Sequence, residues 1–152
     1  MMIRTRLNDT LKDAMKAKDT CAVSTIRLIL AALKDRDIAA RSDGSDANLN
    51  DDQILQLLQS MVKQRNDSIK MYRDGKREDL AEREEREIGI ITTFLPEQMD
   101  ETKMAEAVEA TIADVGASCL KDMGPTMAAL KERYAGKMDF GKASGMVKQR
   151  LG

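Results

Sequence analysis

The sequence contains no histidine and no tryptophan in 152 residues, and only two each of cysteine, proline, tyrosine and phenylalanine. The lack of histidine excludes His-based acid–base catalysis, Ser-His and Cys-His nucleophile pairs, and the commonest metal ligand. Cys21 and Cys119 are too few and too far apart to form a metal site, so we predict no metal and no other cofactor. Two isolated thiols are typical of a reducing cytoplasm, where both remain free.

Long hydrophobic runs are also missing. The longest, Leu28 to Leu33, is far shorter than the ~20 residues that span a bilayer. The opening segment MMIRTRLND lacks the apolar core of a secretory signal. The chain is nevertheless 42% hydrophobic and 34% charged, which is enough apolar side chain for a packed core. We therefore predict a cytoplasmic protein without a membrane partner, and the formal net charge of −1 does not by itself mark a nucleic-acid binder.

Apolar residues recur at helical spacing along the whole chain, and no segment shows the sustained alternation of a strand. On the first segment the stripe includes Ile3 and Met15, and on the second it consists of Val23, Ile26, Leu30 and Leu33. The seven stripes begin at Ile3, Val23, Ile54, Leu80, Met104, Met123 and Phe140. The sequence therefore predicts an all-α protein.

Pro96 marks the best domain boundary, because proline pushes the preceding residue out of helical geometry. Residues 1–95 carry 17 basic and 17 acidic groups, residues 96–120 carry one basic and six acidic, and residues 121–152 carry seven basic and three acidic. We predict an N-terminal domain of about four helices, two or more of them long, over residues 1–95. A small three-helix C-terminal domain is expected over residues 97–152.

Residues that typically begin or end helices lie at the expected positions. Asn50, Asp100 and Asp139 are predicted N-caps, since a short polar side chain can accept a hydrogen bond from the first free backbone N–H groups. Gly116 is a predicted left-handed helix stop. The polar run between Ala40 and Asn50 has no periodicity and predicts a loop.

Four charged residues occupy stripe positions that call for apolar side chains. Arg27 and Arg65 lie on the second and third stripes, and Glu84 and Glu87 lie on the fourth. Because unpaired charges there would be strongly destabilising, we predict that the four meet as a buried ion-pair cluster that fixes helix register. Two alternatives stay open: a polar pocket for a ligand carboxylate or phosphate, and long side chains that reach solvent without meeting.

A near-match to the phosphate-binding loop G-x-x-x-x-G-K-[ST] occurs at residues 136–143, GKMDFGKA. Ala143 replaces the hydroxyl that would bind Mg²⁺, and the preceding segment is predicted as helix rather than strand. Nucleotide hydrolysis is therefore rejected. The sequence offers no other catalytic constellation, and we predict no catalytic residue.

The C-terminal region does carry candidates for contact with a phosphate backbone. Gly141 begins the last predicted helix, where glycine leaves the backbone open and the helix N-terminus favours anions. The RNA-binding candidates are Lys121, Lys131, Arg133, Lys137, Gly141, Lys142, Lys148 and Arg150. An ordinary solvated surface, with tight helix packing at the glycines, is the alternative. With so few aromatics, any RNA would be recognised by shape and phosphates rather than by base stacking.

A series of short motifs runs in order along nearly the whole chain. They include KAKD at 16–19, STIRL at 24–28, VKQRNDSI at 62–69, GKREDLA at 75–81, FLPEQ at 94–98, KDMG at 121–124 and DFGK at 139–142. This series resembles the YqeY family, small bacterial proteins that share their C-terminal half with the tail of the GatB subunit of tRNA-dependent amidotransferases. The resemblance implies an all-helical protein.

In the amidotransferases the corresponding tail helps to hold the tRNA, while the chemistry resides in other domains. The resemblance therefore implies a non-catalytic, tRNA-associated protein. A family-level label of carbon–nitrogen ligase activity, with glutamine as amido-N donor, would describe the larger enzyme rather than this chain. The alternative is a protein–protein interaction module or an accessory subunit of an amidotransferase complex. The partners to expect are thus tRNA, amidotransferase subunits or another protein.

Overall fold

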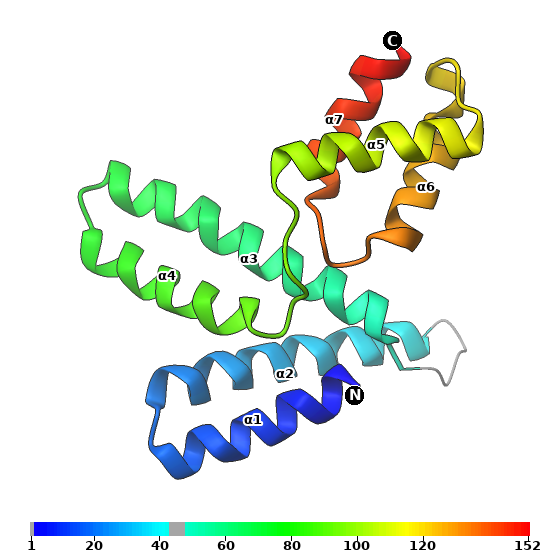
Figure 1. Ribbon diagram of the computed structural model, residues 1–152. Coiled ribbons are helices and arrows are strands. Elements are labelled where there is room, and N and C mark those ends of the chain that lie inside the picture. The colour runs from blue at the N-terminus through cyan, green and yellow to red at the C-terminus, as the bar shows by residue number, and fades with distance from the viewer. Residues whose placement is uncertain (1, 43–47) are drawn as a thin grey trace. The chain divides into compact units, whose positions relative to one another are not determined.

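The computed structural model describes residues 2–42 and 48–152, which form helices and no strand (Figure 1). This confirms the predicted all-α fold. The elements are α1 (Ile3–Ala17), α2 (Thr20–Ser42), α3 (Asp51–Asp74), α4 (Glu78–Thr92), α5 (Glu101–Val115), the short 3₁₀ helix η1 (Leu120–Asp122), α6 (Met123–Arg133) and α7 (Phe140–Leu151). Only η1 has no counterpart among the seven predicted helices.

The chain forms two compact units, residues 1–96 and residues 97–152. We name them the N-terminal unit, with α1–α4, and the C-terminal unit, with α5–α7. In the N-terminal unit α1 packs along α2, α3 packs along α4, and α2 also contacts α4. In the C-terminal unit each of the three α-helices packs against the other two.

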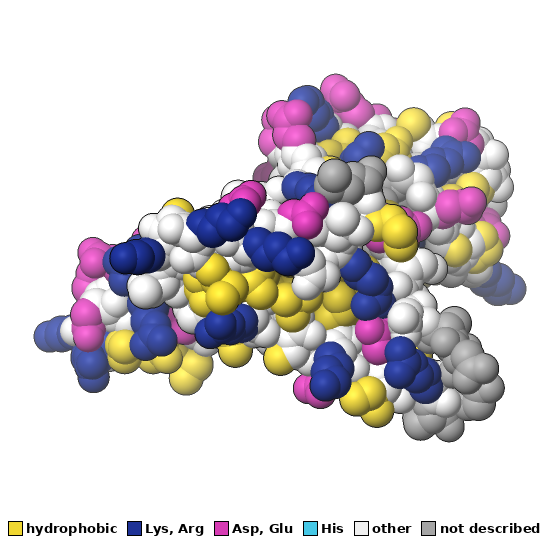
Figure 2. Space-filling model, turned by 90° about the horizontal axis from the view of Figure 1, so that it is seen from below, with side chains coloured by type: hydrophobic (Ala, Val, Ile, Leu, Met, Phe, Trp, Pro, Cys, Tyr) yellow, Lys and Arg dark blue, Asp and Glu magenta, His cyan; other side chains and the backbone are white. Residues whose placement is uncertain are grey.

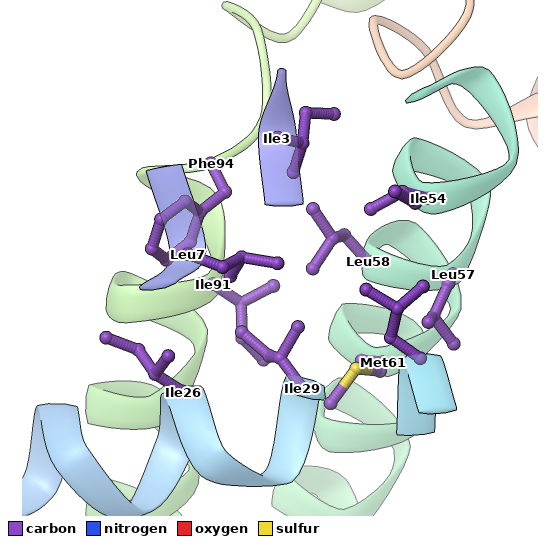
Figure 3. Packing of buried hydrophobic residues seen from close by; sticks show 11 residues of the cluster. Ile3, Leu7, Ile26, Ile29, Ile54, Leu57, Leu58, Met61, Ile91 and Phe94 are labelled. Atoms are coloured by element: carbon purple, nitrogen blue, oxygen red, sulfur yellow. The ribbon is translucent and has the colours of Figure 1, made fainter. Parts of the chain in front are cut away.

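One apolar core joins all four helices of the N-terminal unit (Figure 3). Leu7 of α1, Ile26 of α2, Leu58 of α3 and Ile91 of α4 are all fully buried there, and Phe94 beyond the end of α4 completes the cluster. Burying a side chain of this size stabilises a fold by about 1.5–3 kcal/mol. The four helices are therefore held together mainly by their shared apolar face.

The buried face of α2 is rotated from the predicted stripe. Ile26 and Leu33 of the predicted stripe are buried together with Ile29, which lay outside it, whereas Val23 and Leu30 of the stripe are only half-buried. The reason is that residues 28–33 are apolar throughout, so the sequence there shows a helix without showing which side of it faces the core. This rotation changes which charged residues of α2 can reach the other helices.

The predicted helix caps at Asn50, Asp100 and Gly116 are confirmed. The Asn50 side chain accepts a hydrogen bond from the Gln53 N–H at 2.9 Å, and the Gln53 side chain accepts one from the Asn50 N–H at 2.9 Å, which completes a capping box. The Asp100 side chain accepts from the Lys103 N–H at 2.8 Å. Gly116 ends α5 at φ 67°, a left-handed conformation that glycine adopts without steric cost.

The segment predicted as a loop between Ala40 and Asn50 begins later than expected. Helix α2 continues to Ser42, because residues 40–42 contain no proline or glycine to end it. Residues 43–47 lie outside the described part of the chain. The predicted start of the loop after Ala40 is thus wrong by two residues, and a loop over residues 43–47 stays a prediction.

The core of the C-terminal unit contains no charged side chain among the described residues. Val108 of α5, Leu130 of α6 and Val147 of α7 are fully buried, and Met138 joins them from the connection between α6 and α7. The buried Thr111 hydroxyl donates to a backbone carbonyl of its own helix at 2.8 Å. This small unit is therefore stabilised by apolar packing, with its polar groups satisfied locally.

Candidate functional site

An ion pair joins α3 to α4 inside the N-terminal unit. Arg65 Nε lies 3.0 Å from Glu87 Oε2 and 3.9 Å from Glu84 Oε2, and the three side chains are 11–20% exposed. A second guanidinium nitrogen, Arg65 Nη1, donates to the Met61 carbonyl at 3.3 Å. Because the Arg65 guanidinium already donates to Glu87 and to the Met61 carbonyl, this geometry favours a structural ion pair over a pocket that binds a ligand carboxylate or phosphate.

The two glutamates of this pair are not equivalent. Burial, and then the neighbouring charge of Glu87, raise the pKa of Glu84, while the Arg65 charge acts in the opposite direction. Glu87 lies closer to Arg65 and accepts its hydrogen bond. Arg65 is thus hydrogen-bonded to the Glu87 carboxylate, whereas the Glu84 carboxylate lies farther from the guanidinium and interacts with it more weakly.

Arg27 does not join this cluster, so the prediction was wrong for that residue. Arg27 is exposed and forms no ion pair with any of the described residues. The cause is the rotation of α2: with Ile26 and Ile29 facing the core, the position of Arg27 turns toward solvent. The alternative in which a long side chain reaches water without meeting a partner is therefore correct for Arg27.

A second ion pair, which the sequence reasoning missed, joins α1 to α2. Arg4 Nη1 and Nη2 donate to the two carboxylate oxygens of Asp37 at 2.9 and 2.7 Å. Asp37 is only 7% exposed and also accepts from the Leu49 N–H at 2.9 Å. The hydrogen bonds from Arg4 hold the pKa of Asp37 below its usual range, although burial acts against them. The pair ties α1 and the segment before α3 to α2.

A signal for this pair was present in the sequence. Asp37 lies four residues beyond Leu33 and eight beyond Ile29, so it continues the stripe that α2 buries. The same reasoning that singled out Arg65 applies to it, since a charge on a buried stripe calls for a partner. The partner itself could not be found, because no spacing rule relates residue 4 to residue 37.

The two arginine candidates of the C-terminal unit are engaged by acidic residues of α5. Arg133 Nη1 lies 2.6 Å from Asp114 Oδ2, and Arg150 forms an ion pair with Glu109. These pairs are exposed, so they contribute little to stability. Their effect on the surface is nevertheless clear, because each guanidinium has its charge compensated by a neighbouring carboxylate.

The lysine candidates of the C-terminal unit, unlike its two arginine candidates, are not engaged by carboxylates of the described residues. All are exposed, and none forms an ion pair with a described residue. Lys121 lies in η1, Lys131 in α6, Lys137 in the connection that follows, and Lys142 and Lys148 in α7. The positive charge that remains available on this unit is therefore carried by lysines.

The N-terminus of α7 is already occupied by a carboxylate of the chain. Asp139, the predicted N-cap, accepts hydrogen bonds from the Gly141 N–H at 2.9 Å and from the Lys142 N–H at 3.3 Å. The expectation that Gly141 presents open backbone N–H groups to an anion is therefore corrected. A phosphate at this helix would have to be bound by side chains rather than by the helix N-terminus.

Other kinds of site are not found in the described part of the chain. No helix there is long and apolar enough to cross a membrane. No group of three or more cysteine, aspartate or glutamate residues within residues 2–42 and 48–152 could hold a metal ion.

These features define a small all-helical protein in which Arg4 and Arg65 make partly buried ion pairs and the lysine candidates of the C-terminal unit remain exposed. The chain belongs to the YqeY family, since the family model described as "Yqey-like protein" matches residues 4–151. The match covers both units.

The chain is also similar to fungal proteins named "Altered inheritance of mitochondria protein 41, mitochondrial". The relative from Kluyveromyces lactis is 32% identical over 145 residues, which is 93% of this chain and 72% of the relative. The relative from Lachancea thermotolerans is 32% identical over 151 residues, or 95% of this chain and 76% of the relative. The relative from Candida glabrata is 40% identical over 92 residues, 60% of this chain, and the match spans about half (48%) of that protein's length.

Proposed function

We propose that this protein is a non-catalytic RNA-associated protein that contacts tRNA through the lysines of its C-terminal unit. The observation that carries the proposal is the contrast in charge compensation on that unit. Arg133 and Arg150 are paired with carboxylates of α5, whereas the exposed lysines have no such partner among the described residues. Membership of the YqeY family adds support, because resemblance to that family implies a C-terminal half similar to the amidotransferase tail that helps to hold tRNA.

The proposed mode of recognition is contact with the phosphate backbone of folded RNA. Lysine neutralises phosphates as a point charge and releases condensed counterions, which makes binding strongly salt-dependent. The two aromatic residues of this unit, Tyr134 and Phe140, pack against its apolar core. They offer no exposed platform for stacked bases, so recognition would depend on RNA shape and charge rather than on sequence.

The salt dependence of tRNA binding tests the proposal. The double variant Lys142→Gln, Lys148→Gln should lower the slope of log K against log salt by about 2, since each lysine accounts for about one phosphate contact. The matched control is Arg133→Gln, Arg150→Gln, which removes the same formal charge from the same unit but from residues already paired with carboxylates. Its effect on the slope should be clearly smaller.

Equal effects of the two double variants would reject the lysines as the contact surface. Absence of salt-dependent binding by the unaltered chain would reject the proposal itself. Isolation of the protein from nuclease-treated lysate distinguishes RNA binding from the alternative role as an accessory subunit of an amidotransferase. Such a subunit would keep its protein partners after the RNA is degraded.

The cytoplasm is the proposed location of this chain. Cys21 and Cys119 are both free thiols, as expected in a reducing compartment. The fungal relatives are described by their names as mitochondrial. Fractionation of the source cells, followed by detection of the chain, would decide between the two compartments.

A further inference from the structure

Three adjacent hollows open on the N-terminal unit, and all of them are lined by Leu28 of α2. The largest has a volume of about 750 Å³, and the others of about 350 and 360 Å³. The residues of the largest that matter here are Met15, Lys18, Val23, Arg27, Leu28 and Arg83. We name it the Leu28 groove. It lies where the end of α1, the first half of α2 and the middle of α4 meet.

Apolar side chains that are open to water form part of the lining of the Leu28 groove. Met15 is 51% exposed and Leu28 is 48% exposed, whereas Leu7 of α1 and Ile29 of α2 are fully buried. Figure 2, seen from the side of α1 and α2, shows hydrophobic side chains between those of Lys and Arg on this unit. Apolar area of this kind gains free energy when a partner's apolar surface covers it.

The charged residues that line the Leu28 groove are three cations and one carboxylate, Lys18, Arg27, Arg83 and Glu87, so its formal charge is positive. Lys18 and Arg27 form no ion pair with a described residue. Arg83 reaches Glu87 only at 4.0 Å, and that carboxylate is already hydrogen-bonded to Arg65. A ligand that matches the groove must therefore offer both apolar surface and negative charge.

We infer that the Leu28 groove binds an amphipathic, acidic helix from a protein partner. Such a helix presents apolar residues at intervals of three and four, with carboxylates on either side, which matches a lining that combines exposed apolar side chains with three cations. A nucleic acid fits less well, because the groove has no aromatic side chain for base stacking and a phosphate backbone gains nothing from Met15 or Leu28. The groove is also open rather than enclosed, unlike sites that bury most of a small ligand.

The inference can be tested on the full chain with a defined peptide. The probe is a fluorescein-labelled peptide of about 18 residues, long enough to form a helix, with leucines at helical spacing flanked by glutamates. Its control is a scrambled peptide of the same composition. Fluorescence anisotropy should show binding of the amphipathic peptide, weakening as salt is added, and much weaker binding of the scrambled one.

Variants of α2 supply matched controls for the groove. Leu28→Asp should weaken peptide binding by about tenfold or more, whereas Ile38→Asp should leave it unchanged. Ile38 is 53% exposed on the same helix and lines none of the three hollows. Arg27→Glu should likewise weaken binding and Lys34→Glu should not, since Lys34 is an exposed cation of α2 outside the groove.

Methyl-methionine NMR gives a readout that needs no variant. Addition of the peptide should shift the Met15 methyl signal and leave that of Met71 in place, because Met71 is 73% exposed and lies outside the groove. Three results would overturn the inference: equal binding of the scrambled peptide, equal effects of Leu28→Asp and Ile38→Asp, or an unmoved Met15 signal. Self-association of the chain that Leu28→Asp abolishes would assign the groove to a second copy and would also overturn it.

The outcome is separable from that of the proposed function. The groove residues all belong to the N-terminal unit, whereas the proposed RNA contacts belong to the C-terminal unit. Absence of tRNA binding by the unaltered chain, with specific peptide binding present, would reject the RNA proposal and leave the groove inference intact. Absence of specific peptide binding, with tRNA binding present, would reject the groove inference and leave the RNA proposal intact.

Discussion

The two units of this protein use charged side chains in opposite ways. The N-terminal unit places Arg4 with Asp37 and Arg65 with Glu87 at helix–helix contacts, where the side chains are 10–25% exposed. The C-terminal unit has an uncharged core, and its ion pairs lie on the surface. The N-terminal unit also has exposed ion pairs, between Arg73 and Glu78 and between Arg77 and Asp79, so the two units differ in that only the first has partly buried ion pairs between helices among the described residues.

The comparison also shows how weakly the residue type predicts the role. Arg65 and Arg27 both occupy predicted stripe positions, yet only Arg65 is engaged by carboxylates. Burial and geometry decide the difference, because a desolvated charge needs a partner and a solvated one does not. Variants that remove one partner of a partly buried ion pair should consequently have large effects, whereas variants that remove an exposed charge should have small effects in either unit.

The largest effect is expected at Asp37. Asp37→Asn leaves Arg4 without its bidentate partner and should lower the free energy of unfolding by about 3 kcal/mol. Urea unfolding followed by circular dichroism measures the loss. Asp35→Asn is the matched control, since Asp35 is an exposed carboxylate of the same helix, and it should change stability by less than about 0.5 kcal/mol. Similar losses in the two variants would contradict the role given to the Arg4–Asp37 pair.

The pair also predicts acid sensitivity. Because the pKa of Asp37 is lowered in the fold, its stabilisation is present above the unfolded-state pKa and is lost as pH falls through the folded-state pKa. The unaltered chain should therefore lose stability below about pH 4 more steeply than Asp37→Asn. Parallel pH profiles for the two proteins, measured by urea unfolding, would contradict this linkage.

A similar but somewhat smaller effect is expected at the other internal pair. Arg65→Met leaves the carboxylates of Glu84 and Glu87 partly buried without their cation, and should lower the free energy of unfolding by about 2–3 kcal/mol. The triple variant Arg65→Met, Glu84→Gln, Glu87→Gln should recover most of the loss, because it removes the unpaired charges as well. If urea unfolding shows that Arg65→Met leaves the free energy of unfolding unchanged, the ion pair does not stabilise the fold.

The two glutamates of this pair should respond differently. Glu87→Gln removes the carboxylate hydrogen-bonded to Arg65 and should destabilise by about 1.5 kcal/mol. Glu84 has a raised pKa, so the fold favours its protonated form, and its favourable contribution is full below the unfolded-state pKa and lost as pH rises through the folded-state pKa. Glu84→Gln should therefore be neutral or stabilising at pH 7 in urea unfolding. If Glu84→Gln destabilises the fold as much as Glu87→Gln, both carboxylates are needed to stabilise the buried Arg65 charge.

The smallest effect is expected on the surface of the C-terminal unit. Arg133→Gln removes an exposed ion pair with Asp114 and should change the free energy of unfolding by less than about 1 kcal/mol. Thermal unfolding at low and high salt measures it, and added salt should shrink even this difference. A loss comparable to that of Asp37→Asn would erase the contrast between the units.

Much of the fold could be predicted from the sequence, because helical periodicity and capping are local. The caps at Asn50, Asp100 and Asp139 depend on neighbours within three residues, and each lies as predicted. The rotation of α2 could not be predicted, since an unbroken apolar run from Leu28 to Leu33 does not say which side is buried. That single ambiguity accounts for the misplacement of Arg27.

The candidate sites depended on contacts between helices and were correspondingly harder to predict. Arg65 and the two glutamates were found because each lay on a stripe whose phase was unambiguous. Asp37 was missed, as was its partner Arg4, which lies 33 residues away in the chain. The compensation of Arg133 and Arg150 by α5 carboxylates was likewise invisible in a count of basic residues.

The salt dependence of tRNA binding, compared between the two units, tests the central claim most directly. Two pairs of exposed lysines without ion pairs among the described residues are exchanged for glutamine: Lys142 with Lys148 in the C-terminal unit, and Lys12 with Lys16 in α1. If the C-terminal unit provides the contacts, only the first exchange lowers the slope of log K against log salt, by about 2. An equal fall in both, or a fall confined to the α1 variant, would contradict the division of roles between the two units.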